Sequence, residues 1–326
     1  NESPLGPGPK AREAIARAAK DVSRYPDANG FYLKKRLSEL HGVAPERLTL
    51  GNGSNDVLDV VARCFAGRGG EVIYSEHAFV VFGLAANAVS ATPVVVPATG
   101  WGHDLGAMAD AVTERTRLVF IANPNNPTGT WNTSEELERF VASVPERVIV
   151  VIDQAYAEYV VRDDYPDCVS WVARYPNVVV TRTFSKVHGL AALRVGYAVS
   201  AAPVADYMNR VRHPFNVNSV GLAGALAALD DAEHIAASVA LNREGMLYVT
   251  GALDNLGLEH IRSIGNFVTV DVGRPGAEVF EALLQKGVIV RPVANYGMPN
   301  HLRISIGLAQ ENHRCLEALT AVLGAK

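Results

Sequence analysis

The stretch RVIVVIDQAY, from Arg147 to Tyr156, decides the fold. It contains five consecutive β-branched residues, Val148 to Ile152, followed by the polar Asp153. β-branched residues favour strands, and an apolar run without alternation is typical of a strand that is covered on both faces. The stretch therefore predicts a buried strand of a parallel sheet, with Asp153 at the carboxyl end of that strand.

Similar runs occur on both sides of this stretch, between about residues 48 and 200. They are LTLG at 48–51, EVIYS at 71–75, TPVVVP at 92–97, RLVFIANP at 117–124, NVVVTRT at 177–183 and RVGYAVS at 194–200. Amphipathic segments such as 55–65 and 134–141 separate most of them. Strands that alternate with helices favour an α/β architecture with right-handed crossovers. We therefore expect a mostly parallel seven-stranded sheet.

The pattern changes after this region. Residues 219–256 are predicted to be mostly helical, and NFVTVDV (266–272), GVIVRPV (287–293) and HLRISIG (301–307) alternate with helices near 276–285 and 309–323. This is typical of a smaller α+β domain, which the N-terminal segment is expected to join. The predicted division is a large domain at 28–235 and a small domain at 1–27 and 236–326.

The composition excludes several classes of protein. The 326 residues are 48% hydrophobic and 20% charged, as in ordinary globular proteins, and the net charge is −4. This charge argues against a general nucleic-acid or anionic-membrane binder, and no apolar run is long enough to span a bilayer. The three cysteines are far apart, which predicts a reducing, cytoplasmic setting. Nine scattered histidines suggest no metal site.

The first candidate site is the glycine-rich turn GNGSND, residues 51–56, between a predicted strand and a helix. Ser54 is a plausible N-cap, and the following amides suit a phosphate because the helix dipole lies behind them. The turn matches neither common nucleotide-loop pattern. A capped helix after a tight turn is the alternative interpretation.

Two further motifs lie at the carboxyl ends of predicted strands. IANPNNPTG at 121–129 contains two Asn-Pro steps, which force a chain reversal and leave the Asn123 and Asn126 amides at the carboxyl edge of the sheet. Asp153 and Tyr156 occupy the same edge. Asp153 could cap the next segment, or it could pair with a protonated ring nitrogen while the Tyr156 phenol donates to a neighbouring oxygen.

The segment TRTFSKVHGLAALRVGY, residues 181–197, supplies an amine. Lys186 is the only lysine between Lys35 and Lys286, so general surface charge does not explain it. An amine in a partly dry pocket beside cations is a nucleophile toward aldehydes. Arg194 offers a planar fork for a phosphate, close in sequence to the hydroxyls of Thr183 and Ser185. A ligand with an aldehyde, a phosphate and a ring nitrogen describes pyridoxal phosphate.

Over essentially its whole length, the chain resembles the fold-type I pyridoxal-phosphate aminotransferases. The specific motifs are NPNNPTG, DQAY and SKVHGLAALRVGY. Within this family the chain is most similar to the histidinol-phosphate aminotransferases, on NESPLGP (1–7), SRYPD (23–27), GNGSND, WGHDL (101–105), VIVRP (288–292) and LRISIG (302–307). The resemblance implies a homodimer with shared active sites, which interconverts histidinol phosphate and 2-oxoglutarate with imidazole-acetol phosphate and glutamate.

The resemblance also implies a role for each matching residue. Lys186 would bind the cofactor covalently and move the proton, and Asp153 would hold the ring nitrogen protonated. Asn126 and Tyr156 would bind the ring hydroxyl oxygen, and Phe79 would stack on the ring unless it is simply a core residue. The expected phosphate ligands are Ser54, Asn55, Thr183, Ser185 and Arg194, with Tyr25 from the neighbouring subunit.

Arg291 and Arg303 match the two arginines that hold the anionic end of the substrate, and Asn126 is expected beside them. As isolated features they could equally be surface arginines at strand ends. Gln154 stands where the family usually has glutamate. Because neighbouring side chains on a strand point to opposite faces, we expect little effect on catalysis.

Four alternative functions fit parts of this pattern. A broad aromatic aminotransferase and a decarboxylase acting on threonine phosphate would use the same cofactor site, because substrate choice depends on the shape of the pocket. A non-catalytic binding domain is disfavoured, because Lys186, Asp153 and Arg194 are all present. A doubly wound nucleotide-binding domain is disfavoured because no fitting glycine motif occurs.

Overall fold

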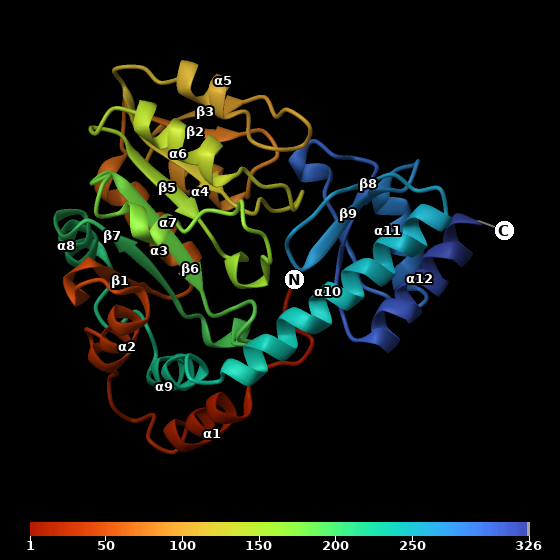
Figure 1. The fold of residues 1–326 in the computed structure, drawn as a ribbon, viewed down its shortest axis with the longest axis horizontal. Helices are drawn as coiled ribbons and strands as arrows, with labels where there is room; N and C mark the ends of the chain where they lie inside the picture. Colours follow the sequence, from red (N-terminus) through yellow and green to blue (C-terminus); the bar gives the residue numbers. More distant parts are fainter. Residues whose placement is uncertain (325–326) are drawn as a thin grey trace.

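The computed structural model describes residues 1–324, and its centre is a seven-stranded sheet (Figure 1). The strand order is β1-β7-β6-β5-β4-β2-β3. The strands are β1 (Leu48–Gly51), β2 (Glu71–Ser75), β3 (Thr92–Val96), β4 (Thr116–Ala122), β5 (Ile149–Asp153), β6 (Val178–Thr183) and β7 (Gly196–Ser200). Strands β3, β2, β4, β5 and β6 are parallel, and β7 runs antiparallel to both of its neighbours, β6 and β1. The predicted mostly parallel sheet is confirmed.

Helices cover both faces of this sheet, which explains its continuous apolar runs. One face packs on α3 (Ser54–Phe65), α4 (Val81–Ala88) and α8 (Ala202–Val211). The other packs on α1 (Pro9–Ala18), α2 (Phe31–His41), α5 (Leu105–Asp110), α6 (Ser134–Ser143), α7 (Cys168–Trp171) and α9 (Ser219–Ala228). Within β5, Val150 and Ile152 face one core and Ile149 and Val151 the other. Alternation along the strand thus divides one apolar run between two cores.

A second, antiparallel sheet forms the C-terminal region, with strand order β10-β11-β9-β8. Its strands are β8 (His260–Ile261), β9 (Phe267–Asp271), β10 (Arg291–Pro292) and β11 (His301–Ser305). The helices of this region are α10 (Ala232–Asn255), α11 (Gly276–Leu284) and α12 (Ala309–Leu323). The long helix α10 leads from the first sheet to the second (Figure 1). The expected α+β region is therefore present.

The strand predicted for GVIVRPV is wrong in extent, since only Arg291 and Pro292 are paired as β10. The segment leaves a turn at Gly287, which has a positive φ of 73°. Val288 and Val290 are buried in the small core without strand pairing, so their apolar pattern comes from packing. The short strand β8 was not predicted at all, because two residues leave no periodic signal.

The division at residues 28 and 235 remains our proposal. The side chain of Ser305 in β11 and that of Asn266 donate hydrogen bonds to Asn1, which ties the start of the chain to the second sheet. Helix α1 instead packs against α9 (Figure 1). The N-terminal segment thus contacts both the C-terminal region with the second sheet and helix α9, which packs on the first sheet.

Within residues 1–324, no helix is long and apolar enough to cross a membrane. The same range contains no group of three or more His, Cys, Asp and Glu side chains placed to hold a metal ion.

Candidate active site

The carboxyl ends of β4, β5 and β6 open into a cavity of about 750 Å³. Ligands bind at this edge in open α/β sheets. Small-domain residues close the other side, among them Arg291 and Arg303. The lining contains all but one of the predicted site residues: Ser54, Asn55, Phe79, Asn126, Asp153, Tyr156, Thr183, Ser185, Lys186, Arg194, Arg291 and Arg303.

Lys186 lies in the loop that follows β6, with its side chain half-buried. Its Nζ donates a hydrogen bond of 3.4 Å to the carbonyl of Asn1 and lies 5.2 Å from the centre of the Tyr156 ring. The Tyr156 hydroxyl accepts a hydrogen bond of 3.0 Å from the Asn1 amide. Within residues 1–324 the Lys186 amine forms no ion pair with a carboxylate, and it faces the ring of Tyr156.

Asp153 ends β5 and is 4% exposed. Burial raises its pKa to about 6, because an ionised carboxylate loses hydration there, although a hydrogen bond from Thr181 and the charge of Lys186 oppose the shift. The Thr181 hydroxyl donates to Asp153 at 2.8 Å. The buried carboxylate of Asp153 has this one side-chain donor in the described structure, so it can accept a further hydrogen bond from a donor in the cavity.

The turn before α3 differs from the prediction in one respect: Ser54 is the first helical residue, and Gly53 is the N-cap. Gly53 has a φ of 85°, and no side chain caps the helix. The first amides therefore keep no side-chain acceptor, which suits an anion. A serine at N1 can still present its hydroxyl to the cavity.

Arg194 closes this end of the cavity. Its Nη1 donates to the Ala191 carbonyl at 2.9 Å and to Ser185 Oγ at 3.5 Å. A Cβ on Gly53 would come within 2.5 Å of Arg194 Nη2, so only glycine allows this approach. A guanidinium, two hydroxyls and helix amides converge here, and this donor set fits a phosphate group.

The opposite end of the cavity carries two arginines. Arg291 and Arg303 are directly paired in register across β10 and β11. Arg303 donates to Asn126 Oδ1, lies 5.4 Å from the centre of the Phe267 ring and keeps its buried Nε without a partner. Burial lowers the pKa of Arg303, and the charge of Arg291 adds to this shift. Like charges placed opposite one another repel, so this pair suits a bound anion.

Phe79 lines the cavity from the loop between β2 and α4. Its ring meets Phe82 edge-on at 6.0 Å and is only partly buried. It therefore has both a core contact and a surface toward the cavity.

Gln154 points away from this cavity, as predicted for the neighbour of Asp153. Its amide nitrogen donates to Tyr165 Oη and to the Pro166 carbonyl, both at 3.1 Å. Its carbonyl oxygen accepts from Arg182 at 3.0 Å. The side chain is buried in a polar network behind the sheet, where glutamine is fully paired.

Tyr25 is the one predicted site residue outside the cavity. It is 83% exposed and stacks on Phe215, with ring centres 4.8 Å apart. This position is compatible with a role at another chain's site, and Tyr25 does not line the cavity that holds Lys186 of its own chain.

Sequence reasoning missed a residue that supports the site and several that line the cavity. Thr181 could have been found from its place on the strand next to Asp153, because the two residues are in register. Tyr296, Phe280 and Ile289 enter the cavity from the small domain, where no sequence motif marks them. Asn1 was visible only as part of the NESPLGP resemblance.

Comparison with known proteins identifies relatives over nearly the whole chain. A family model described as aminotransferase class I and II matches residues 1–319. Histidinol-phosphate aminotransferase 2 of Pseudomonas fluorescens is 56% identical over 323 residues, which cover 99% of this chain and 87% of the relative. Histidinol-phosphate aminotransferase 1 of Idiomarina loihiensis is 52% identical, with coverage of 99% and 88%.

Solved structures agree. A histidinol-phosphate aminotransferase from Sinorhizobium meliloti, in complex with pyridoxal 5′-phosphate, has a TM-score of 0.93 and 30% identity, and covers 99% of this chain and 89% of that one. An aspartate aminotransferase from Thermus thermophilus has a TM-score of 0.88 at 22% identity, with coverage of 99% and 94%, and supports the fold alone.

Proposed function

Because the chain belongs to the class I and II aminotransferases, we propose that it interconverts histidinol phosphate and 2-oxoglutarate with imidazole-acetol phosphate and glutamate. The names of its relatives at 52–56% identity support this substrate. The observation that carries the proposal is the pair Arg291 and Arg303, which face the same cavity as Lys186. The reaction needs an amine that transfers the proton and guanidinium groups that bind the substrate phosphate. Lys186 and the two arginines supply them.

Pyridoxal 5′-phosphate is the proposed cofactor. When bound, it supplies an aldehyde that condenses with amines and a ring that withdraws electrons from the substrate. Arg194, Ser185 and the first turn of α3 fit its phosphate, and the approach of Arg194 to Gly53 supports this fit. Asn55 and Thr183 would complete the phosphate site. Phe79 would stack against the ring.

Lys186 would move the reacting proton. Its Nζ would accept the proton that leaves the substrate Cα and would hold it beside the reacting atoms. Asp153, buried at the end of β5, would keep the ring nitrogen protonated, since an ionised carboxylate in a dry site attracts a cation strongly. Tyr156 and Asn126 would hydrogen-bond the ring hydroxyl oxygen.

The two arginines would read the other end of the substrate. Arg303 is the inner residue, and its unpaired Nε and contact with Asn126 support a role with either anion, phosphate or carboxylate. Arg291 is more exposed and would add its fork for the dianionic phosphate. A carboxylate carries one negative charge, so it needs the second guanidinium group less than a dianionic phosphate does.

We propose that two chains form a homodimer with shared active sites. Tyr25 is exposed and stacks on the exposed Phe215, and Phe31 and Tyr32, a few residues further along the chain, are also exposed and meet edge-on. An apolar surface of this kind is typical of an interface. A cytoplasmic location is also proposed, supported by Cys64, Cys168 and Cys315, all of which are free thiols.

A half-transamination screen tests the proposed function. The holoenzyme is mixed with one amino donor at a time, and bleaching of the yellow cofactor band is followed. Histidinol phosphate and glutamate should bleach the band rapidly, and phenylalanine and histidinol should be poor donors. Equal rates with phenylalanine would replace the proposal with a broad aromatic aminotransferase, and no bleaching with any donor would leave a binding protein.

A further inference from the structure

Tyr296 forms part of the catalytic cavity wall on the side of the small domain. It ends the short 3₁₀ helix η4 (Ala294–Tyr296), which follows β10 and its Arg291. The side chain is 9% exposed. Its ring belongs to a small apolar cluster with Ile261, Val293 and Met298. Because packing fixes the ring, the hydroxyl at its tip has a fixed place.

The hydroxyl of Tyr296 is a proton donor without an acceptor. Burial raises the pKa of this phenol, while the charge of Arg303, a hydrogen bond from the Val80 backbone and the charge of Arg291 oppose the shift. The phenol therefore keeps its proton near pH 7. Within residues 1–324 it donates to no other group, and it is not among the fully enclosed unpaired atoms. Its hydrogen is free for an acceptor in the cavity.

His77 fixes the backbone of Tyr296 from the large domain. It is 8% exposed and lies in the loop between β2 and α4, which also carries Phe79. Its Nδ1 lies 2.6 Å from the Tyr296 carbonyl oxygen, in a buried contact. A carbonyl oxygen can only accept, so Nδ1 carries the hydrogen and donates it. One buried hydrogen bond thus joins the large domain to the residue that lines the cavity.

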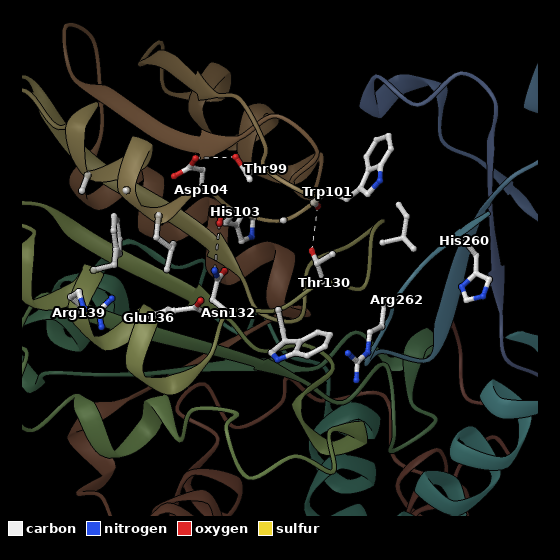
Figure 2. Close-up of a pocket in the computed structure, with 18 of the residues that line it drawn as sticks. Thr99, Trp101, His103, Asp104, Thr130, Asn132, Glu136, Arg139, His260 and Arg262 are labelled. Atoms are coloured by element: carbon white, nitrogen blue, oxygen red, sulfur yellow. Dashed lines mark hydrogen bonds between the residues drawn. The ribbon is translucent and has the colours of Figure 1, made fainter.

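His77 is itself held on two sides. Its backbone carbonyl accepts a buried hydrogen bond of 3.0 Å from Asn125 Nδ2. Its ring lies 5.2 Å from the ring of Trp101, which lies 5.1 Å from that of His301 in the small domain. Figure 2 shows Trp101 extending toward the small domain, with its backbone carbonyl bonded to the Thr130 hydroxyl at 3.3 Å. His77 therefore has little freedom to move away from Tyr296.

A neutral donor suits this end of the cavity. Arg291 and Arg303 are paired across β10 and β11, where their like charges repel. A phosphate ester presents three acceptor oxygens. A third cation would add to the repulsion between the arginines, whereas a phenol supplies a further hydrogen bond without a further charge.

We propose that Tyr296 is a specificity-determining residue, whose phenol donates a hydrogen bond to the phosphate of the substrate, and that His77 is the positioning residue that holds it there. The inference rests on the function proposed above, since it assigns a further donor to the same phosphate. Histidinol has no phosphate and should not use this donor.

Tyr296→Phe in the holoenzyme tests the first part, because it removes one hydroxyl and keeps the packed ring. The ratio of kcat/KM for histidinol phosphate to that for histidinol should fall about tenfold, as expected for one hydrogen bond to a charged group. Tyr248→Phe is the matched control. It removes a hydroxyl that contacts His313, outside the cavity, and should leave the ratio unchanged.

Two variants of His77 test the second part. His77→Phe keeps a ring beside Trp101 but loses the donor, and the ratio should fall about three- to tenfold. His77→Asn places an amide N–H where Nδ1 lies and should restore most of the ratio. In the Tyr296→Phe background, His77→Phe should lower the ratio by less than about twofold further, since the hydroxyl that it positions is already absent. A purely structural role would give losses that multiply.

Three results would overturn the proposal. An unchanged ratio in Tyr296→Phe, with a high wild-type ratio, would overturn this inference alone. Equal losses in His77→Phe and His77→Asn, or losses that multiply in the double variant, would remove the positioning role. A wild-type ratio near one would contradict the proposed function and this inference together. Tyr296→Phe gives its answer even if the His77 variants fail to fold.

Discussion

The two ends of the catalytic cavity are built differently. At the cofactor end, Asp153 and Lys186 come from or directly follow parallel strands whose backbone is fixed by neighbours on both sides. At the substrate end, Arg291 sits on a two-residue strand at the edge of the small sheet and is exposed. Groups held rigidly suit chemistry common to every amino donor, while an edge position suits the choice among donors. Substitutions at the two ends should therefore differ in kind.

Lys186→Ala should have the largest effect. Without its amine, no group in the cavity can move the proton at the substrate Cα, and we expect turnover to fall by at least about 10³-fold with every donor. Steady-state rates with histidinol phosphate and glutamate measure this. Borohydride reduction of the wild type should attach the cofactor at Lys186, and attachment at another lysine would contradict the assignment.

Asp153→Asn should follow, with a loss of about 10²–10³-fold in cofactor affinity, the usual effect of removing one partner of a buried charge pair. The stability of the cofactor-free wild-type protein should also depend on pH. Because burial raises the pKa of Asp153 from 3.8 to about 6, its stabilising contribution to the cofactor-free protein is complete below pH 3.8 and is lost as the pH rises through 6.

Cofactor binding should show the opposite trend, since it needs the ionised carboxylate. Affinity should increase as the pH rises through about 6. Titration of the apoprotein with cofactor between pH 5 and pH 8 measures this step. Asp153→Asn is the matched control and should lack the step. An identical step in that variant would show that another group titrates.

Arg303→Ala tests the inner residue of the substrate end. A charge-assisted hydrogen bond contributes roughly 1.5–3 kcal/mol, so kcat/KM should fall about ten- to a hundredfold in both half-reactions. The cofactor spectrum should not change. Arg303→Lys keeps the charge without the fork and should recover only part of the loss. A loss confined to one half-reaction would contradict the common role.

A mixing experiment tests whether the cofactor end is completed by a second chain. Tyr25→Ala and Lys186→Ala chains are combined after exchange, and each heterodimer should contain one intact site. Activity should recover to about one quarter of the wild-type value at random pairing. No recovery despite demonstrated exchange would mean that each site is built within one chain.

Gln154→Glu should have the smallest effect. The side chain lies behind the sheet, bonded to Arg182 and Tyr165, so kcat should change less than about threefold. The measurement is kcat with histidinol phosphate. A larger change would show that the network behind β5 acts on Asp153.

Much of the cofactor end could be predicted from the sequence, because buried parallel strands leave continuous Val and Ile runs and their ends are marked by polar residues. Two details could not. Ser54 was expected to cap α3, but Gly53 takes that position through its positive φ. Thr181 was missed as the partner of Asp153, since their contact depends on the register between β5 and β6.

The substrate end and the contact between the two domains were less predictable. Val288 and Val290 are buried in the core of the small domain without strand pairing. Their apolar pattern therefore predicted a longer strand than the two residues of β10. The meeting of Trp101 with His301 depends on how two bodies pack together, and no local pattern encodes that. Arg291 and Arg303 were found from the family resemblance, whereas their direct pairing required the structure.

One measurement tests the central claim most directly: the ratio of kcat/KM for histidinol phosphate to that for histidinol, in the wild type and in Arg291→Ala. We predict that the wild type prefers the phosphate ester by about ten- to a hundredfold or more. The ratio should fall toward one in the variant, with glutamate little affected. Equal use of both compounds by the wild type would contradict the phosphate-reading role and the function proposed from it.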